Sequence, residues 1–147
     1  MNAPSDTAES TVHRCPACDT VLPFEPHLPP FNASCLACGY LLWCSKRTVD
    51  DEVVLDVVRG KTPDVRDIDR VVESLVYTHG IAGVRIDLSR IDSVTCAFIA
   101  RLVTLNKRLK TAGGRLTVCG LRPIVRETFD RLGLYKALHI TDGGPEA

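Results

Sequence analysis

Four of the seven cysteines form two close pairs in the first third of the chain. Cys15 and Cys18 make one Cys-x-x-Cys pair, Cys35 and Cys38 make the other, and sixteen residues separate the pairs. Each pair can turn both of its sulfurs toward one point, and two such turns complete the tetrahedron of thiolates that zinc accepts. The spacing therefore predicts a closed, structural zinc site. An iron–sulfur centre and two redox-active disulfides are the alternatives.

The segment that carries these cysteines is expected to fold around the metal. Residues 13–48 are rich in proline and hold little apolar bulk, whereas metal binding supplies folding free energy directly. We therefore expect residues 13–48 to be a zinc ribbon, with His13 and His27 as bystanders. Cys44 is expected to be a packed thiol rather than a further ligand. Trp43 is expected either to fill the small core of the ribbon or to dock the ribbon on the rest of the chain.

An alternation of strand-like and helix-like patterns begins at Glu52 and predicts an α/β unit. Asp64 is the expected N-cap of the first helix, and Gly80 is its expected end. The expected strands are 52–58, 84–88, 116–118 and 137–140. The first expected helix carries an apolar stripe over residues 65–76 and ends at Gly80, and the other expected helices are 96–111 and 123–132. Short connections between these elements predict a small, largely parallel sheet covered by helices.

Length and composition set the limits for the whole chain. The 147 residues leave room for one ordinary domain and a small module, so we expect tails at 1–12 and 143–147, the ribbon at 13–48 and an α/β domain at 52–142. Lysine and arginine total 18, as do aspartate and glutamate, so the formal net charge is zero. A chain without net positive charge has no general electrostatic attraction to nucleic acid or anionic membranes. We expect a cytoplasmic protein without a membrane segment, because the chain shows neither a secretory signal nor a long apolar run.

A long run of residues in this α/β unit carries a family resemblance. It begins Ile86-Asp-Leu-Ser-Arg-Ile-Asp-Ser-Val-Thr-Cys-Ala-Phe-Ile-Ala and continues with Leu105-Asn-Lys-Arg-Leu-Lys-Thr-Ala-Gly-Gly-Arg-Leu. Further on come Val118-Cys-Gly-Leu-Arg-Pro-Ile-Val-Arg-Glu-Thr-Phe and Gly133-Leu-Tyr-Lys-Ala-Leu. These residues resemble the bacterial STAS domains of anti-sigma factor antagonists, and the resemblance covers roughly residues 52–142. It implies a regulatory domain that acts without a cofactor.

The resemblance also implies where a partner binds. Domains of this family dock on an anti-sigma factor kinase, and phosphorylation of a serine at the start of the second helix, usually in Asp-Ser-Ser/Ala-Gly-Leu-Gly, releases them. An alignment without gaps places six residues of this chain at that motif: Thr95, Cys96, Ala97, Phe98, Ile99 and Ala100. These residues are the expected partner surface, and the partner is expected to be an anti-sigma factor or a related regulator. A cysteine offers no hydroxyl to a serine kinase, and Phe98 replaces a glycine.

Three hypotheses follow for this turn. The domain binds its partner constitutively or through another signal, which is the interpretation we favour. Alternatively, Thr95 or Ser93 accepts a phosphate, although capping of the helix is the simpler role for Thr95. Finally, Cys96 is a redox-sensing thiol activated by the helix N-terminus, although a small buried cysteine is the simpler role there as well.

Two other classes of function receive little support from the sequence. No Ser/His/Asp arrangement, phosphate-binding glycine loop or carboxylate pair stands out, so we do not expect an enzyme. The ribbon could make the protein a nucleic-acid-binding or transcription-associated adaptor. However, no lysine or arginine lies between Cys15 and Cys38, so the phosphate contacts of such an adaptor are missing there. Lys107, Arg108 and Lys110 are expected to form a solvated face of the second helix, with an acidic partner as the alternative.

Overall fold

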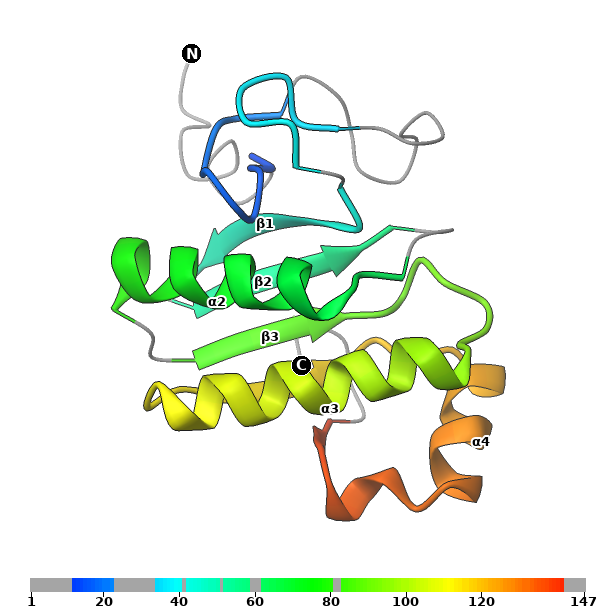
Figure 1. Cartoon of the computed structure of the whole chain (residues 1–147). Coiled ribbons are helices and arrows are strands. Elements are labelled where there is room, and N and C mark those ends of the chain that lie inside the picture. The colour runs from blue at the N-terminus through cyan, green and yellow to red at the C-terminus, as the bar shows by residue number, and fades with distance from the viewer. Residues whose placement is uncertain are drawn as a thin grey trace.

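A five-stranded sheet forms the centre of the fold (Figure 1). The computed structural model describes residues 12–22, 34–40, 42–50, 52–58, 62–80 and 83–141. The strands are β1 (Cys44–Val49), β2 (Glu52–Val57), β3 (Gly83–Asp87), β4 (Arg115–Cys119) and β5 (His139–Ile140), and they lie side by side in this order. β1 pairs with β2 antiparallel, and all other pairs are parallel. The expected α/β class with a largely parallel sheet is therefore confirmed.

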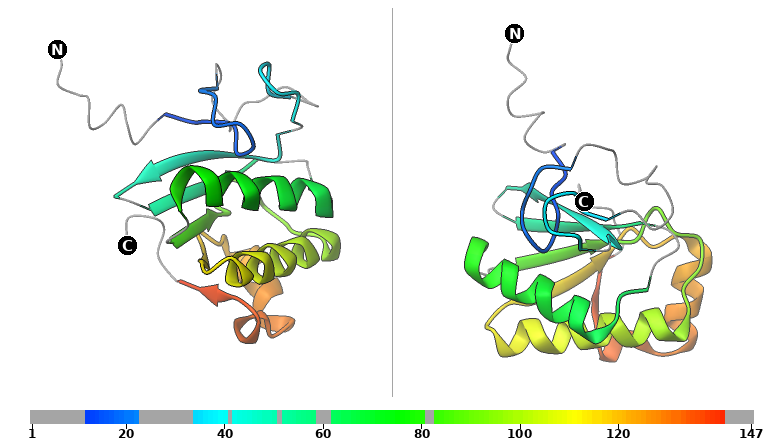
Figure 2. Two further views of the ribbon diagram at one scale, coloured as in Figure 1. Left: turned by 60° about the vertical axis from the view of Figure 1, so that its left-hand side comes forward. Right: turned by 45° about the horizontal axis from the view of Figure 1, so that its top comes forward.

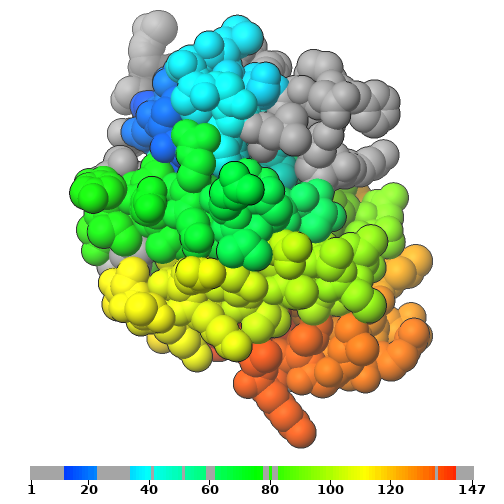
Figure 3. All heavy atoms as spheres, in the orientation of Figure 1, coloured from blue at the N-terminus to red at the C-terminus, as the bar shows by residue number. Residues whose placement is uncertain are grey.

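Helices follow the parallel strands. They are α2 (Val65–His79), α3 (Cys96–Thr111), α4 (Pro123–Arg131) and the short 3-10 helix η1 (Leu134–Lys136). α2 begins at Asp64, whose side chain forms a capping box with Asp67, and it ends at Gly80 in the left-handed conformation, as expected. α2 and α3 cover most of one side of the sheet (Figure 3). None of the helices within the described residues is long and apolar enough to cross a membrane.

The core lies between this side of the sheet and the helices. Leu55, Ile86 and Val118 stand next to one another on β2, β3 and β4, and all three are fully buried. The helices contribute apolar side chains at spacings of three and four, which places these side chains on one face of each helix. The buried positions of α3 are Phe98, Ile99, Leu102, Leu105, Asn106 and Leu109.

The cysteine-rich segment shares this core. Cys15, Leu22 and Cys35 belong to the same cluster of buried residues as the strands and helices. Both parts of the segment lie over the β1 edge of the sheet (Figure 2). β1 begins at Cys44, within residues 13–48, so the sheet begins inside the expected ribbon, and the division of the chain into domains stays a prediction. Apart from Val12, the expected tails fall outside the described residues, as does His27.

The end of the chain differs from expectation. We expected a strand over residues 137–140, but the structure has η1 followed by a strand of two residues, His139–Ile140. The buried side chain of Asn106 donates a hydrogen bond from Nδ2 to the carbonyl oxygen of Ala137 at 2.9 Å. This bond comes from α3, and it occupies an oxygen that a longer β5 would need for pairing.

Candidate functional site

The four cysteines of the two pairs meet at one point. Their sulfur atoms all lie within 4.8 Å of one another, although the pairs come from distant parts of the chain. The Cys15 and Cys38 sulfurs are 3.8 Å apart, and the Cys18 and Cys35 sulfurs are 3.6 Å apart. A disulfide would need about 2.0 Å. Zn–S bonds of about 2.3 Å in a tetrahedron would place the sulfurs about 3.8 Å apart. The cluster therefore fits a metal ion held by four thiolates.

The two pairs reach this geometry through the same backbone turn. Asp19 N donates to the carbonyl of Cys15 at 2.9 Å, and Gly39 N donates to the carbonyl of Cys35 at 2.8 Å. Asp19 and Gly39 both have a positive φ, which suits glycine and is tolerated by aspartate. Each turn therefore presents its two sulfurs on one side, as the Cys-x-x-Cys spacing predicts.

The thiols of the cluster differ in acidity. Burial raises the pKa of Cys15 far above its ordinary value, and burial also raises the pKa of Cys38. Burial acts on Cys18 in the same direction, but hydrogen bonds with Thr20, Cys35 and Cys38 together outweigh burial and lower the pKa of Cys18 to about 7. Since a metal ligand must be a thiolate, metal binding has to displace protons from the buried members of the cluster. The affinity of the cluster for a metal should therefore fall in acid.

Several contacts join the cluster to the sheet and to α2. Arg14 and Lys46 exchange backbone hydrogen bonds of 2.7 and 2.8 Å, which adds a bridge at the outer edge of β1. The buried ammonium of Lys46 lies 2.8 Å from Asp19, the neighbour of the candidate ligand Cys18. Trp43 Nε1 donates to Tyr40 Oη at 2.8 Å, and this hydroxyl donates to a carbonyl of α2. Trp43 is therefore a docking residue within the shared core.

Cys44 and Cys119 are packed thiols. Both are fully buried, Cys44 in β1 and Cys119 in β4, and neither belongs to the cluster of four. Burial raises the pKa of Cys119 to about 12 and raises the pKa of Cys44 as well. At neutral pH both side chains are thiols with little nucleophilic character. This agrees with the packing role expected for Cys44, and Cys119 has the same role in β4.

The turn into α3 lies at the carboxyl end of the parallel strands. Thr95 is the N-cap of α3, and its hydroxyl accepts a hydrogen bond of 3.0 Å from the backbone N–H of Phe98. The exposed residues of this turn are Ser93, Thr95, Cys96, Ala97 and Ala100. Phe98 and Ile99 are instead buried in the core, so they cannot belong to a surface in this conformation. Their spacing to Leu102, Leu105 and Leu109 follows the buried face of α3.

The start of α4 stands beside this turn. Arg122 Nε donates to the carbonyl of Ser89 at 2.8 Å, and its guanidinium lies 3.4 Å from Asp92. Ile124, in the first turn of α4, is 64% exposed. Figure 1 shows the start of α3 and the helix α4 at the same end of the molecule. The candidate surface therefore combines the turn into α3 with the start of α4.

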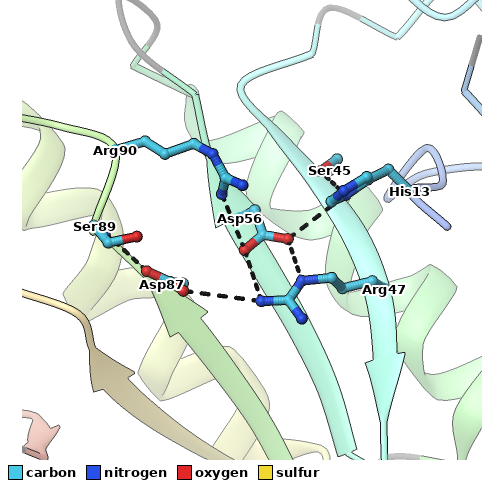
Figure 4. A network of polar contacts seen from close by, with 7 residues as sticks. All are labelled: His13, Ser45, Arg47, Asp56, Asp87, Ser89 and Arg90. Atoms are coloured by element: carbon cyan, nitrogen blue, oxygen red, sulfur yellow. Dashed lines mark hydrogen bonds and ion pairs between the residues drawn. The ribbon is translucent and has the colours of Figure 1, made fainter. Parts of the chain in front are cut away.

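A network of charges supports the turn from within (Figure 4). Asp56 is fully buried on β2, and Arg47 of β1 contacts both of its carboxylate oxygens, at 2.7 and 3.3 Å. Arg90, from the loop that leads to α3, lies 3.4 Å from Asp56. Asp87, the neighbour of Asp56 on β3, accepts a hydrogen bond of 2.8 Å from the N–H of Ser89. The network therefore fixes the loop before the candidate surface.

The network also includes His13, which precedes the cysteine cluster in the chain. His13, two residues before Cys15, places its Nδ1 atom 3.7 Å from Asp56 and 3.2 Å from the Ser45 hydroxyl. His13 is no member of the cysteine cluster, but its contacts make it more than a bystander. Sequence reasoning missed this network because its members come from three separate segments. The sequence held one signal of this network: an aspartate stands in each of two otherwise largely apolar strands, Asp56 in β2 and Asp87 in β3.

Comparisons with known proteins agree with this architecture. Among solved structures, the anti-sigma factor antagonist SpoIIAA in its unphosphorylated form has a TM-score of 0.51 and 15% identity, over 70% of this chain and 90% of that chain. A variant of RsbS from Moorella thermoacetica has a TM-score of 0.50 and 20% identity, over 69% of this chain and 90% of that chain. At these identities the likeness is one of fold. The search of curated proteins gave no match.

The sequence itself gives the stronger result. The model of the STAS domain family matches residues 39–146, which is more than half of the chain. The match includes β1 and all the elements that follow it. The sheet and its helices share their fold with the solved SpoIIAA structure. The match of the family model over most of the sequence shows that this chain belongs to the STAS domain family.

Proposed function

We propose that this protein is a non-enzymatic, cytoplasmic regulatory module that binds a signalling protein through the turn into α3. The partner is an anti-sigma factor or a related regulator. The observation that carries the proposal is the exposure of Thr95, Cys96, Ala97 and Ala100 at the tip of a STAS fold. These side chains are short, so a partner can approach the helix closely. The exposed Ile124 at the same end offers an apolar contact beside them.

The proposed module works without the serine switch of its relatives. Cys96 occupies the aligned position of the phosphorylated serine and is exposed there, but a thiol is no substrate for a serine kinase. Thr95 and Ser93 remain as candidate phosphate acceptors, since both are exposed. A phosphate would add about −1.5 to −2 charge to the surface, and on Thr95 it would alter the cap of α3. We favour constitutive binding, because the Thr95 hydroxyl already has a structural partner.

We further propose that the ion held by Cys15, Cys18, Cys35 and Cys38 is zinc and that its role is structural. Four thiolates around one point leave no open position for a substrate, which favours a structural over a catalytic site. In this proposal residues 13–48 form a ribbon that the metal closes, and residues 52–142 form the partner-binding domain. The ribbon then stabilises the β1 edge of the sheet through Lys46 and Trp43.

Affinity capture with matched variants tests the proposed surface. The full chain serves as bait in native cells, and bound proteins are quantified by mass spectrometry. Ala97→Glu introduces a charge on the proposed surface, and Thr111→Glu introduces the same charge at the exposed far end of the same helix. We expect a partner that the wild type and Thr111→Glu recover equally and that Ala97→Glu recovers at least tenfold less, corresponding to about 1.4 kcal/mol. Equal recovery by Ala97→Glu would refute the surface, provided that both variants unfold at the same temperature as the wild type.

A further inference from the structure

A cavity lies at the opposite end of the domain from the turn into α3. Its volume is about 270 Å³, and it is formed where the last turn of α3, the start of β4 and the segment from η1 to β5 meet. Leu116 and Leu138, both buried, line it together with Asn106. The hydrogen bond from Asn106 to Ala137 fixes one wall. Figure 1 shows that α3 runs away from α4 toward this end of the molecule.

Among the described residues, the charged side chains that line this cavity are those of Lys110, Arg115 and Lys136, and all three are basic. They are exposed, so their charged ends are accessible from the solvent, and the exposed imidazole of His139 lies beside them. No aspartate or glutamate of the described part of the chain lines the cavity. The four side chains come from α3, β4, η1 and β5, so the topology of the whole domain brings them together.

These cations also lack the partners that other cations of the molecule have. Arg47, Arg90 and Arg108 each pair with an aspartate. Within the part of the chain that the structure describes, by contrast, Lys110, Arg115 and Lys136 form no ion pair. Three cations without an ion pair among the described residues therefore border one cavity. Like charges so close together repel each other unless an anion lies between them.

A helix dipole explains only part of this cluster. Lys110 lies in the last turn of α3, where a cation interacts favourably with the helix C-terminus. Arg115 and Lys136 lie outside any such turn of α3, yet they border the same cavity. Pockets for drug-sized ligands begin at about 300 Å³, so an occupant of this cavity must be small. Buried leucines next to cations suit a small anion with a short organic part.

We propose that this cavity binds a small anion with at least two negative charges, of the class of phosphate esters and diphosphates. Lys110, Arg115 and Lys136 supply the charge, and charge-assisted hydrogen bonds from these donors hold the anion. The site lies at the amino ends of the parallel strands, whereas the partner surface lies at their carboxyl ends. Anion binding therefore does not depend on the proposed partner.

Titration of the full-length protein with pyrophosphate, followed by amide NMR, tests the site. We expect saturable shifts centred on Lys110, Arg115, Lys136 and His139. Arg115→Gln/Lys136→Gln should weaken the affinity at least tenfold, because it removes two charged donors. The matched control is Arg66→Gln/Lys107→Gln, which removes two exposed cations outside the cavity and should change the affinity less than twofold.

Three outcomes would overturn the proposal. The first is an absence of saturable shifts at millimolar pyrophosphate. The second is an equal loss of affinity in the control pair, which would show attraction to net charge alone. The third is an unchanged affinity in Arg115→Gln/Lys136→Gln. Ala97→Glu should bind pyrophosphate like the wild type, so a failure of the partner surface would leave this result intact.

Discussion

Replacement of the buried carboxylate of Asp56 by an amide should destabilise the whole fold. Asp56 is fully buried, and the guanidinium of Arg47 contacts both of its oxygens while Arg90 lies 3.4 Å away. Removal of one partner from a buried ion pair costs about 3–5 kcal/mol, because the other charge stays behind without compensation. Asp56→Asn keeps the shape and one acceptor oxygen, so we expect about 3 kcal/mol. That is a large part of a total stability of about 5–15 kcal/mol.

Urea unfolding followed by circular dichroism, with excess metal present, measures this loss. With a denaturant slope of about 2 kcal/mol/M, a loss of about 3 kcal/mol lowers the urea midpoint by about 1.5 M. Arg47→Met provides the second arm of a double-mutant cycle. The double variant should be more stable than the sum of the single losses predicts, by about 2 kcal/mol, since it leaves less uncompensated charge. Single losses below about 1 kcal/mol, or additivity within about 0.5 kcal/mol, would refute a buried, coupled network.

Three further predictions concern the metal, a glycine and the helix cap. Cys35→Ser should abolish stoichiometric metal binding and lower the unfolding temperature, and acidification should release the metal from the wild type. Metal analysis measures the bound metal, and thermal melts measure the unfolding temperature. Full metal content in Cys35→Ser would contradict a metal site at the four cysteines. Gly120→Ala should lower the free energy of unfolding by about 2–3 kcal/mol, because Gly120 has a φ of +71° and the new methyl group would collide with Asp87. Gly113 also has a positive φ but lies in open space, so Gly113→Ala should cost only about 1 kcal/mol. Equal losses for the two variants in urea unfolding would contradict the crowding at Gly120. Thr95→Ala should cost about 1 kcal/mol and Thr95→Ser much less; a neutral Thr95→Ala would remove the capping role.

The parts of the fold that depend on local chemistry could be predicted from the sequence. The Cys-x-x-Cys turns, the capping box at Asp64 and the end of α2 at Gly80 are set by residues a few positions apart. α3 has the bounds that its pattern predicts. In each case neighbouring residues determine the conformation, so a single sequence contains enough information.

The parts that depend on distant contacts could not be predicted in this way. β1 looked like the end of the ribbon, because its role in the sheet depends on pairing with β2, as between Lys46 and Leu55. The network around Asp56 joins residues from positions 13 to 90, and no local pattern indicates such pairs. The expectation that Phe98 and Ile99 lie on the surface came from an alignment. The helical spacing of Phe98 to Leu102 and Leu109 would have placed Phe98 in the core.

Hydrogen–deuterium exchange of the captured complex tests the central claim most directly, because it locates the partner on the full-length protein without any substitution. The claim is that the turn into α3, together with the start of α4, is the surface that binds a regulatory protein. It predicts that the partner slows exchange within residues 92–100 and 122–126 and leaves the exposed face of α2 unchanged. Protection confined to α2 or to the cysteine cluster, with residues 92–100 unchanged, would contradict it.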